Sequence, residues 1–142
     1  MAIKISDLSV GDWVRYKGEE CTIASIYMAA EGYPHEVALT HQGISCGLAY
    51  IDYLEPILIT PEILKANGFE EHCGGIFRYE WMWQGESSGI TLCSFDEELW
   101  FVDLFFKEGK DIMCNIPTFS IHQLQHILRL AGVDKEIVMS NK

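Results

Sequence analysis

Short alternating patterns of hydrophobic and polar residues fill the first part of the chain and predict β-strands. The segment His35–His41 shows this most clearly, with Val37 and Leu39 on one face and Glu36 and Thr40 on the other. Three further runs are rich in β-branched and aromatic residues and lie between glycine-containing turns: residues 12–16, 21–28 and 44–51. Strands of this length and spacing predict an SH3-like small β-barrel over residues 1–58.

A short helix is predicted where the second part of the chain begins. Thr60 is a favourable N-cap, and Pro61 occupies the first helical position, where its missing N–H group does no harm. Asn67 and Gly68 form a left-handed C-cap signal, so the helix is expected to end just before them. We expect this helix to open a second module that spans residues 59–142.

The strongest strand pattern of the chain lies in residues 76–84, where side chains alternate strictly between two faces. Four aromatic residues share one of these faces: Phe77, Tyr79, Trp81 and Trp83. Residues 85–89 predict a turn-rich loop, and three apolar runs follow it: residues 90–95, 99–106 and 111–116. Together these segments predict an antiparallel meander of about four strands.

A final helix is predicted after Ser120 and has clear boundary signals. Ser120 and Gln123 form a capping-box pair, and Gly132 ends the helix in a Schellman-type cap. One half of the helical surface is apolar: Ile121, Leu124, Ile127, Leu128, Leu130 and Ala131. The narrower opposite face is expected to meet solvent: His122, Gln125, His126 and Arg129. The chain as a whole therefore predicts an α+β protein, in which two helices pack on the meander.

The charge balance disfavours some classes of partner. The 142 residues carry a net charge of −11. Residues 1–58 contain three basic and eight acidic residues, net −5, and residues 59–142 contain seven and thirteen, net −6. Neither part predicts the positive surface of a protein that binds duplex DNA, and the same charge opposes binding to anionic membranes. The acidic residues 96–98 are interpreted as a solvated turn, because the alternating oxygen ligands of a calcium loop are absent.

The sequence predicts a cytoplasmic location. No apolar run approaches the roughly 20 residues that cross a bilayer, and the first residues are polar and acidic where a signal peptide would be apolar. The five cysteines form no CxxC pair, which argues against a disulfide framework and a zinc finger: Cys21, Cys46, Cys73, Cys93 and Cys114. We interpret them as reduced thiols that act as small apolar side chains.

Two sets of residues could carry chemistry, although neither forms a complete motif. His122 and His126 are four residues apart on one helical face, a usable spacing for two metal ligands, but no third ligand is near in sequence. Cys73 lies in a His-Cys-Gly-Gly loop, where Glu70 and Glu71 oppose formation of a thiolate. The sequence therefore predicts no enzyme activity, no catalytic residues and no cofactor. A metal or thiol site is the less favoured alternative.

The aromatic residues of the meander predict either a binding surface or a core. Trp81 and Trp83 could stack nucleobases, but such platforms lie in positive grooves, so core packing is favoured. Residues 99–106 carry large apolar side chains on both faces, more than two short helices can easily cover. One face is therefore expected to meet the N-terminal module, a partner protein or a second copy of the chain.

The segments ITPEILKANGF (residues 59–69) and SIHQLQHILRLAGVDKEIV (residues 120–138) resemble a family of uncharacterised small bacterial and prophage proteins, which carry similar LTPEIL..NGF and HxLQ..LRL.G patterns. That resemblance implies no catalytic residues and implies a role linked to mobile elements or phage. The segment Val10–Ile26 is similar to the opening of SH3-like or KOW-type barrels, and three residues match: Gly11, Val14 and Gly18. Such barrels bind peptides, RNA or other proteins.

These observations favour a non-enzymatic protein-interaction or accessory protein of bacterial or prophage origin. The hypothesis depends on the absence of a catalytic motif and on the surplus apolar surface of the predicted meander. An alternative is a nucleic-acid- or ribosome-associated module that acts through the barrel, with four contact candidates: Trp13, Arg15, Tyr16 and Lys17. A third alternative is a metal or thiol site that uses His122, His126 or Cys73.

Overall fold

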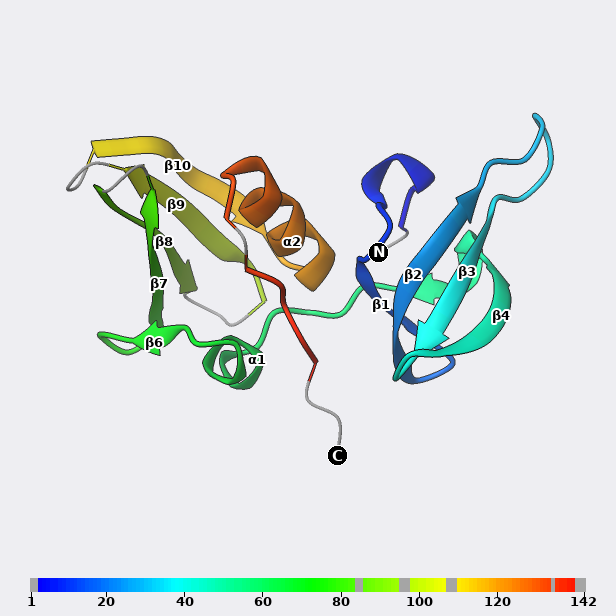
Figure 1. Ribbon diagram of the computed structural model, residues 1–142, viewed down its shortest axis with the longest axis horizontal. Coiled ribbons are helices and arrows are strands. Elements are labelled where there is room, and N and C mark those ends of the chain that lie inside the picture. Colours follow the sequence, from blue (N-terminus) through cyan, green and yellow to red (C-terminus); the bar gives the residue numbers. More distant parts are fainter. Residues whose placement is uncertain (1–2, 84–85, 95–97, 107–109, 134, 140–142) are drawn as a thin grey trace. The chain divides into compact units, whose positions relative to one another are not determined.

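The computed structural model describes residues 3–83, 86–94, 98–106, 110–133 and 135–139, and the side chains of residues 83, 86, 106 and 110–115 lie outside this description. The chain forms two compact units. The first contains residues 1–57 and 120–125, and the second contains residues 58–119 and 126–140. Antiparallel strands combine with helices in the chain (Figure 1), so the predicted α+β class is confirmed.

The first unit is built on a five-stranded antiparallel sheet in the order β4-β3-β2-β1-β5. Its strands are β1 (Trp13–Tyr16), β2 (Glu19–Tyr27), β3 (Glu36–His41), β4 (Ile44–Tyr50) and β5 (Leu54–Glu55). A 3-10 turn, η1 (Ile5–Asp7), precedes β1, and a second, η2 (Ile51–Tyr53), joins β4 to β5. Because β4 and β5 are the outer strands, hydrogen bonds between the described residues do not close this sheet into the predicted barrel.

Two-residue turns connect β1 to β2 and β3 to β4. Lys17 and Gly18 have φ values of 51° and 79°, and Gln42 and Gly43 have values of 52° and 78°. Positive φ at both central residues is typical of type I′ turns, whose twist matches that of the flanking antiparallel strands. These turns fix the register of the two hairpins, and the register decides which side chains share a face.

One face of the first sheet buries the hydrophobic core of its unit. Cys21 and Ile23 of β2 and Val37 and Leu39 of β3 are almost fully buried. Other buried members come from the remaining strands and turns: Leu8, Val14, Ala49, Ile51 and Leu54. Since successive side chains of a strand point to opposite faces, the residues between these core positions lie on the outer face of the sheet.

The second unit contains a five-stranded antiparallel sheet in the order β10-β9-β8-β7-β6. Its strands are β6 (Glu70–Glu71), β7 (Ile76–Trp83), β8 (Glu86–Ser94), β9 (Trp100–Phe106) and β10 (Lys110–Thr118). The predicted loop over residues 85–89 is wrong in part, because Ser87 and Ser88 pair with β7. The short strand β6 extends the meander by pairing with β7.

Helix α1 (Pro61–Ala66) has the predicted caps. The N–H group of Ile63 donates to the hydroxyl oxygen of Thr60 at 3.2 Å, and Gly68 has a φ of 86° after the last turn. The N–H group of Phe69 donates to the carbonyl of Leu64 at 3.0 Å, which closes the C-terminal cap. Local signals therefore set the two ends of this short helix, and the fully buried side chain of Leu64 adds the packing that a six-residue helix needs.

Helix α2 (Ile121–Leu130) also has the predicted caps. The N–H groups of Ser120 and Gln123 donate to each other's side-chain oxygens at 3.3 and 3.4 Å. The N–H group of Val133 donates to the carbonyl of Leu128 at 3.0 Å, and Gly132 has a φ of 76°, as in a Schellman motif. Within the described residues, neither this helix nor any other is long and apolar enough to span a membrane.

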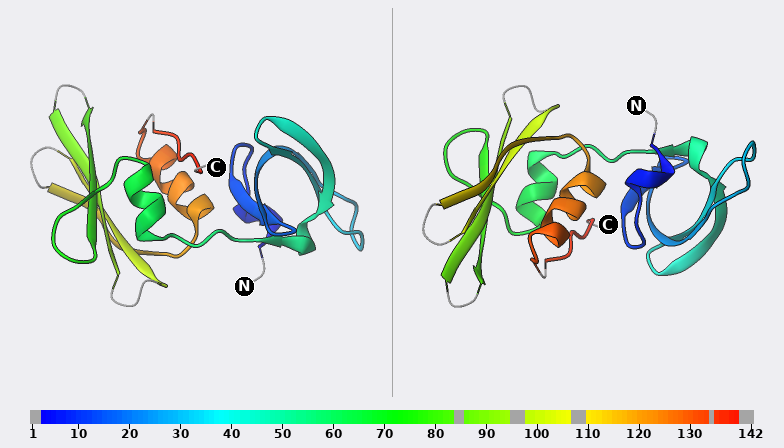
Figure 2. Two further views of the ribbon diagram at one scale, coloured as in Figure 1. Left: turned by 90° about the horizontal axis from the view of Figure 1, so that it is seen from below. Right: turned by 90° about the horizontal axis from the view of Figure 1, so that it is seen from above.

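Helix α1 and the later residues of α2 lie on one side of the second sheet (Figure 2). Phe77 of β7, Leu92 of β8 and Val102 of β9 lie opposite one another across the strands and are almost fully buried. The indole N–H of Trp100 donates to the carbonyl of Ile59 at 3.2 Å, which joins this sheet to the segment before α1.

An extended C-terminal segment completes the second unit. The amide of Asn67 accepts a hydrogen bond from the N–H group of Val138 at 2.7 Å and donates to its carbonyl at 3.0 Å. The same amide donates to the carbonyl of Ile63 at 2.9 Å. Ile137 and Met139, on either side of Val138, are buried. Asn67 therefore fastens this segment to the end of α1.

Candidate functional site

The aromatic stripe of β7 packs against other side chains of the second unit. The ring of Tyr79 lies 5.4 Å from that of Phe69 and 6.3 Å from that of Trp81, measured between centroids. The ammonium group of Lys135 lies 5.3 Å from the centroid of the Tyr79 ring. The side chain of Trp83 lies outside the described residues. Tyr79 therefore lies at the edge of the core, where other side chains partly cover its ring, and the ring is not open for stacking with a nucleobase.

On the opposite face of this sheet, neighbouring residues cover the large apolar side chain of Phe105. Phe105 of β9 lies across Gly89 of β8, and the guanidinium carbon of Arg78 is 4.4 Å from the Phe105 ring centroid. Arg78 also forms an ion pair with Glu80 at 2.8 Å. Phe105 is only 8% exposed. The described residues of this face therefore supply less open apolar surface than the sequence predicts.

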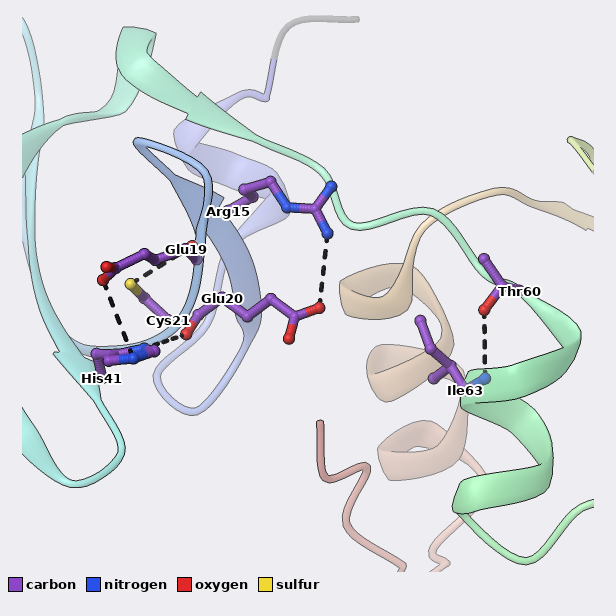
Figure 3. Close-up of polar contacts among 7 residues, drawn as sticks. All are labelled: Arg15, Glu19, Glu20, Cys21, His41, Thr60 and Ile63. Atoms are coloured by element: carbon purple, nitrogen blue, oxygen red, sulfur yellow. Dashed lines mark hydrogen bonds and ion pairs between the residues drawn. The ribbon is translucent and has the colours of Figure 1, made fainter. Parts of the chain in front are cut away.

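The basic contact candidates in and after β1 have partners within the first unit. Arg15 forms an ion pair with Glu20 at 3.5 Å, and the two residues lie opposite each other in the β1–β2 register (Figure 3). Lys17 lies 5.3 Å from the centroid of the Tyr16 ring. Trp13 is half-buried. These contacts hold the two cations against their own sheet, which weakens the case for a nucleic-acid surface here.

A second polar group lies at the same end of the β1–β2 hairpin. The Nδ1 atom of His41 is hydrogen-bonded to the carbonyl of Glu20 at 2.9 Å, and its Nε2 atom lies 4.0 Å from the Glu19 carboxylate (Figure 3). The thiol of Cys21 donates to the carbonyl of Glu19 at 3.7 Å. The contacts of His41 link β3 to β2, the Cys21 contact lies within β2, and nothing in their arrangement forms a reaction centre.

The predicted exposure of His122 is wrong. His122 is 4% exposed and Gln125 is also buried, whereas His126 is half-buried and Leu130 is exposed. The amide of Gln125 explains much of the difference, because it accepts from the N–H group of Trp13 at 2.9 Å and donates to the carbonyl of Gly11 at 3.0 Å. Among the described residues, no three His, Cys, Asp or Glu side chains come together as a metal site.

The thiols differ in exposure and form no disulfide among the described residues. Cys21 is buried and Cys93 is half-buried, while Cys46 and Cys73 are exposed. Burial raises the pKa of Cys21 to about 11, and the neighbouring Cys46 and Glu19 act in the same direction. Cys21 is therefore unreactive at neutral pH. The side chain of Cys114 and the acidic turn predicted at residues 96–98 lie wholly or largely outside the described residues.

Within the described residues, exposed large apolar residues are more numerous in the first unit than in the second. Most of those in the first unit form the group described next. They come from β2, the loop after it, β4 and η2: Tyr27, Met28, Tyr33, Ile44, Leu48, Tyr50 and Tyr53. Tyr27 is 53% exposed, Leu48 57%, Tyr50 45% and Tyr53 66%. Single exposed apolar residues are ordinary, but a group on one sheet is a feature of binding surfaces.

Strand register aligns part of this group into a row. Glu36 of β3 pairs with Tyr27 of β2 on one side and with Tyr50 of β4 on the other, so the three side chains share a face. Leu48 occupies the next row, opposite Ala38. The Tyr53 ring lies 6.2 Å from the Tyr50 ring. We call Tyr27, Glu36, Leu48, Tyr50 and Tyr53 the tyrosine face.

The sequence around the tyrosine face contains no positive charge of the lysine or arginine type. Neither residue occurs between Lys17 and Lys65, whereas seven acidic residues do: Glu19, Glu20, Glu31, Glu36, Asp52, Glu55 and Glu62. The sequence does not predict this surface, because alternation within one strand does not show which residues of neighbouring strands lie side by side. The stretch without lysine or arginine, in which several tyrosines occur, was the available signal.

No protein-family model, curated protein or solved structure matches this chain.

Proposed function

We propose that this chain is a non-enzymatic protein-interaction module and that the tyrosine face is its binding surface. The observation that carries the proposal is the row Tyr27–Glu36–Tyr50, in which two exposed tyrosines flank one carboxylate on a continuous sheet face. Tyrosine is enriched in protein interfaces, because its ring supplies a large contact area with few rotatable bonds and its hydroxyl can form hydrogen bonds.

The strand order of the first unit supports a finer proposal about its fold. The order β4-β3-β2-β1-β5, with the 3-10 turn η2 between β4 and β5, is the connectivity that we propose to be SH3-like. Small β-folds of this kind serve many binding functions, so the fold adds plausibility to an interaction role and does not select the partner.

The cellular setting is also a proposal. Two exposed thiols, Cys46 and Cys73, suit a reducing compartment, which supports the cytoplasm as the location. The segments at residues 59–69 and 120–138 support an origin in a bacterium or its prophage through their resemblance to proteins of that kind.

Site-specific photo-crosslinking in cells tests the interaction proposal. A benzophenone amino acid replaces Leu48 on the tyrosine face or, as the control, Met82 on the second sheet, which is also exposed. We expect one adduct of defined mass from position 48, its loss when Tyr27→Ala is added, and no such adduct from position 82. The same adducts from both positions, or none from position 48, would contradict the proposal.

A further inference from the structure

The tyrosine face has a spacing that suits a cationic side chain. Tyr27 and Tyr50 lie on strands that are separated by β3, so their backbones are about 10 Å apart, twice the distance between neighbouring strands. A guanidinium or ammonium group is attracted to an aromatic ring when it lies within about 6 Å of the ring centroid. A cation midway above β3 would lie about 5 Å to the side of each flanking strand, a spacing compatible with contact to both rings.

A carboxylate stands at the base of this space. Glu36 lies between the two tyrosines, and within the part of the chain that the structure describes it forms no ion pair. Its neighbour His35 is already engaged, because the Nδ1 atom of that ring accepts the N–H group of Ala29 at 2.9 Å. Glu36 is thus placed to pair with a charge from outside the chain.

Charge decides between the possible occupants. A phosphate or nucleic-acid backbone would meet Glu36 with no lysine or arginine from residues 18–64 to offset it. A second copy of the chain would bring the same acidic stretch against itself. A basic partner is complementary to this surface, and complementary charge increases both association rate and specificity.

The outer edge of β4 favours side-chain contacts over strand addition. The β3–β4 register shifts between Leu39 and Thr40, and Gly47 on β4 has a φ of 86°. A bulge of this kind interrupts the regular ladder that an added strand would need. Leu48 and Tyr53, which are exposed beside the row, offer apolar contacts to residues that flank the cation.

We infer that the tyrosine face binds an extended segment of a partner protein through an arginine or lysine side chain, held between Tyr27 and Tyr50 above the Glu36 carboxylate. This inference rests on the proposed interaction function and adds the chemical class of its partner.

Fluorescence anisotropy with a labelled peptide tests it. The probe is Gly-Arg-Gly-Arg-Gly-Arg, and its neutral counterpart carries citrulline in place of each arginine. We expect the arginine peptide to bind at least tenfold more tightly than the citrulline peptide. Glu36→Gln is expected to weaken the arginine peptide about threefold to fivefold, and Tyr27→Leu and Tyr50→Leu about twofold to fivefold each.

Matched variants separate the site from general attraction to an acidic protein. Asp7→Asn removes the same charge from an exposed position in η1, and Tyr33→Leu removes an exposed tyrosine outside the row. Both are expected to change affinity less than twofold. Equal losses from Glu36→Gln and Asp7→Asn, or unchanged affinity in both row-tyrosine variants, would overturn the cation site.

The two proposals fail in different ways. An adduct from position 48 together with no preference for arginine over citrulline means that the tyrosine face binds a partner of other chemistry, which overturns only the present inference. Dimerisation that Tyr50→Leu abolishes, measured by sedimentation equilibrium, would also overturn it by making a second copy the occupant. Absence of both the adduct and the peptide affinity overturns both proposals.

Discussion

Gly89 of β8 lies directly opposite Phe105 of β9, and the Phe105 ring occupies the space that a side chain at residue 89 would need. A Cβ atom at residue 89 would lie 2.7 Å from Cε1 of that ring and closer still to its Cζ atom. The same ring is capped by the Arg78 guanidinium. Because residue 89 is glycine, the Phe105 ring can pack closely against β8 on the outer face of the second sheet.

This contact predicts that Gly89→Ala destabilises the protein. The Phe105 ring would have to leave Gly89 and expose apolar surface, so we expect a loss of about 1–3 kcal/mol in the free energy of unfolding, measured by urea denaturation. Gly74→Ala is the matched control, because no atom lies within 4 Å of its Cβ position, and it should change stability by less than about 0.5 kcal/mol. Similar effects from the two substitutions would contradict the account of Gly89.

The amide of Asn67 predicts a local effect at the C-terminal segment. Asn67→Ala removes two hydrogen bonds to the backbone of Val138 and one to the carbonyl of Ile63, so we expect a loss of about 2–3 kcal/mol in the free energy of unfolding. Amide hydrogen exchange at Val138 should become much faster. The Val133 amide is the internal control, because its bond to the Leu128 carbonyl is untouched. An unchanged rate of amide hydrogen exchange at Val138 would show that the hydrogen bonds of Asn67 do not hold the C-terminal segment.

The thiol of Cys21 predicts a stability change at alkaline pH. Burial, with Cys46 and Glu19, raises its pKa from 9.0 to about 11. The unfolded thiol therefore loses its proton at lower pH than the folded one, so this thiol's contribution is complete below pH 9 and is lost as pH rises to 11. Cys21→Ala should make the fall in the free energy of unfolding between pH 9 and pH 11 smaller by up to about 2–3 kcal/mol. It should also change the free energy of unfolding by an amount that does not depend on pH. If the free energy of unfolding falls equally with pH in both proteins across this range, the raised pKa of Cys21 is refuted.

We expect no useful affinity for nucleic acid, because the Arg15 side chain is already paired with Glu20. Among the described residues of the first unit, the other lysines and arginines are Lys4 and Lys17, and the Lys17 ammonium group lies over the Tyr16 ring. A labelled single-stranded thymidine oligonucleotide should show no anisotropy change at low salt, where phosphate contacts are strongest. Binding that weakens with added salt and with Arg15→Gln would restore the nucleic-acid alternative.

Local signals allowed the sequence to predict some elements closely. The ends of α1 follow from Thr60 and Gly68, which act within a few residues of themselves, and the capping of α2 by Ser120 and Gln123 is equally local. The turn at Lys17 depends only on the two residues in it. Such features need no knowledge of distant segments, so a single sequence is enough to place them.

Non-local contacts account for what the sequence did not predict. Gly89 in a serine-rich stretch favours a loop until β9 supplies Phe105 as its partner. His122 lies on the polar half of an isolated helix, yet it is buried in the folded chain, where its neighbour Gln125 bonds to the backbone of Gly11. The row of the tyrosine face exists only through the register of three strands, which alternation within each strand does not determine.

The most direct measurement for the tyrosine face is an NMR titration of the ¹⁵N-labelled chain with the arginine peptide. Shifts concentrated at the amides of Tyr27, Glu36 and Tyr50, and absent when the citrulline peptide is added, are the predicted result. Shifts that spread over the acidic residues of both units, or that leave the three amides of this row unchanged, would contradict the claim that this face is the binding surface.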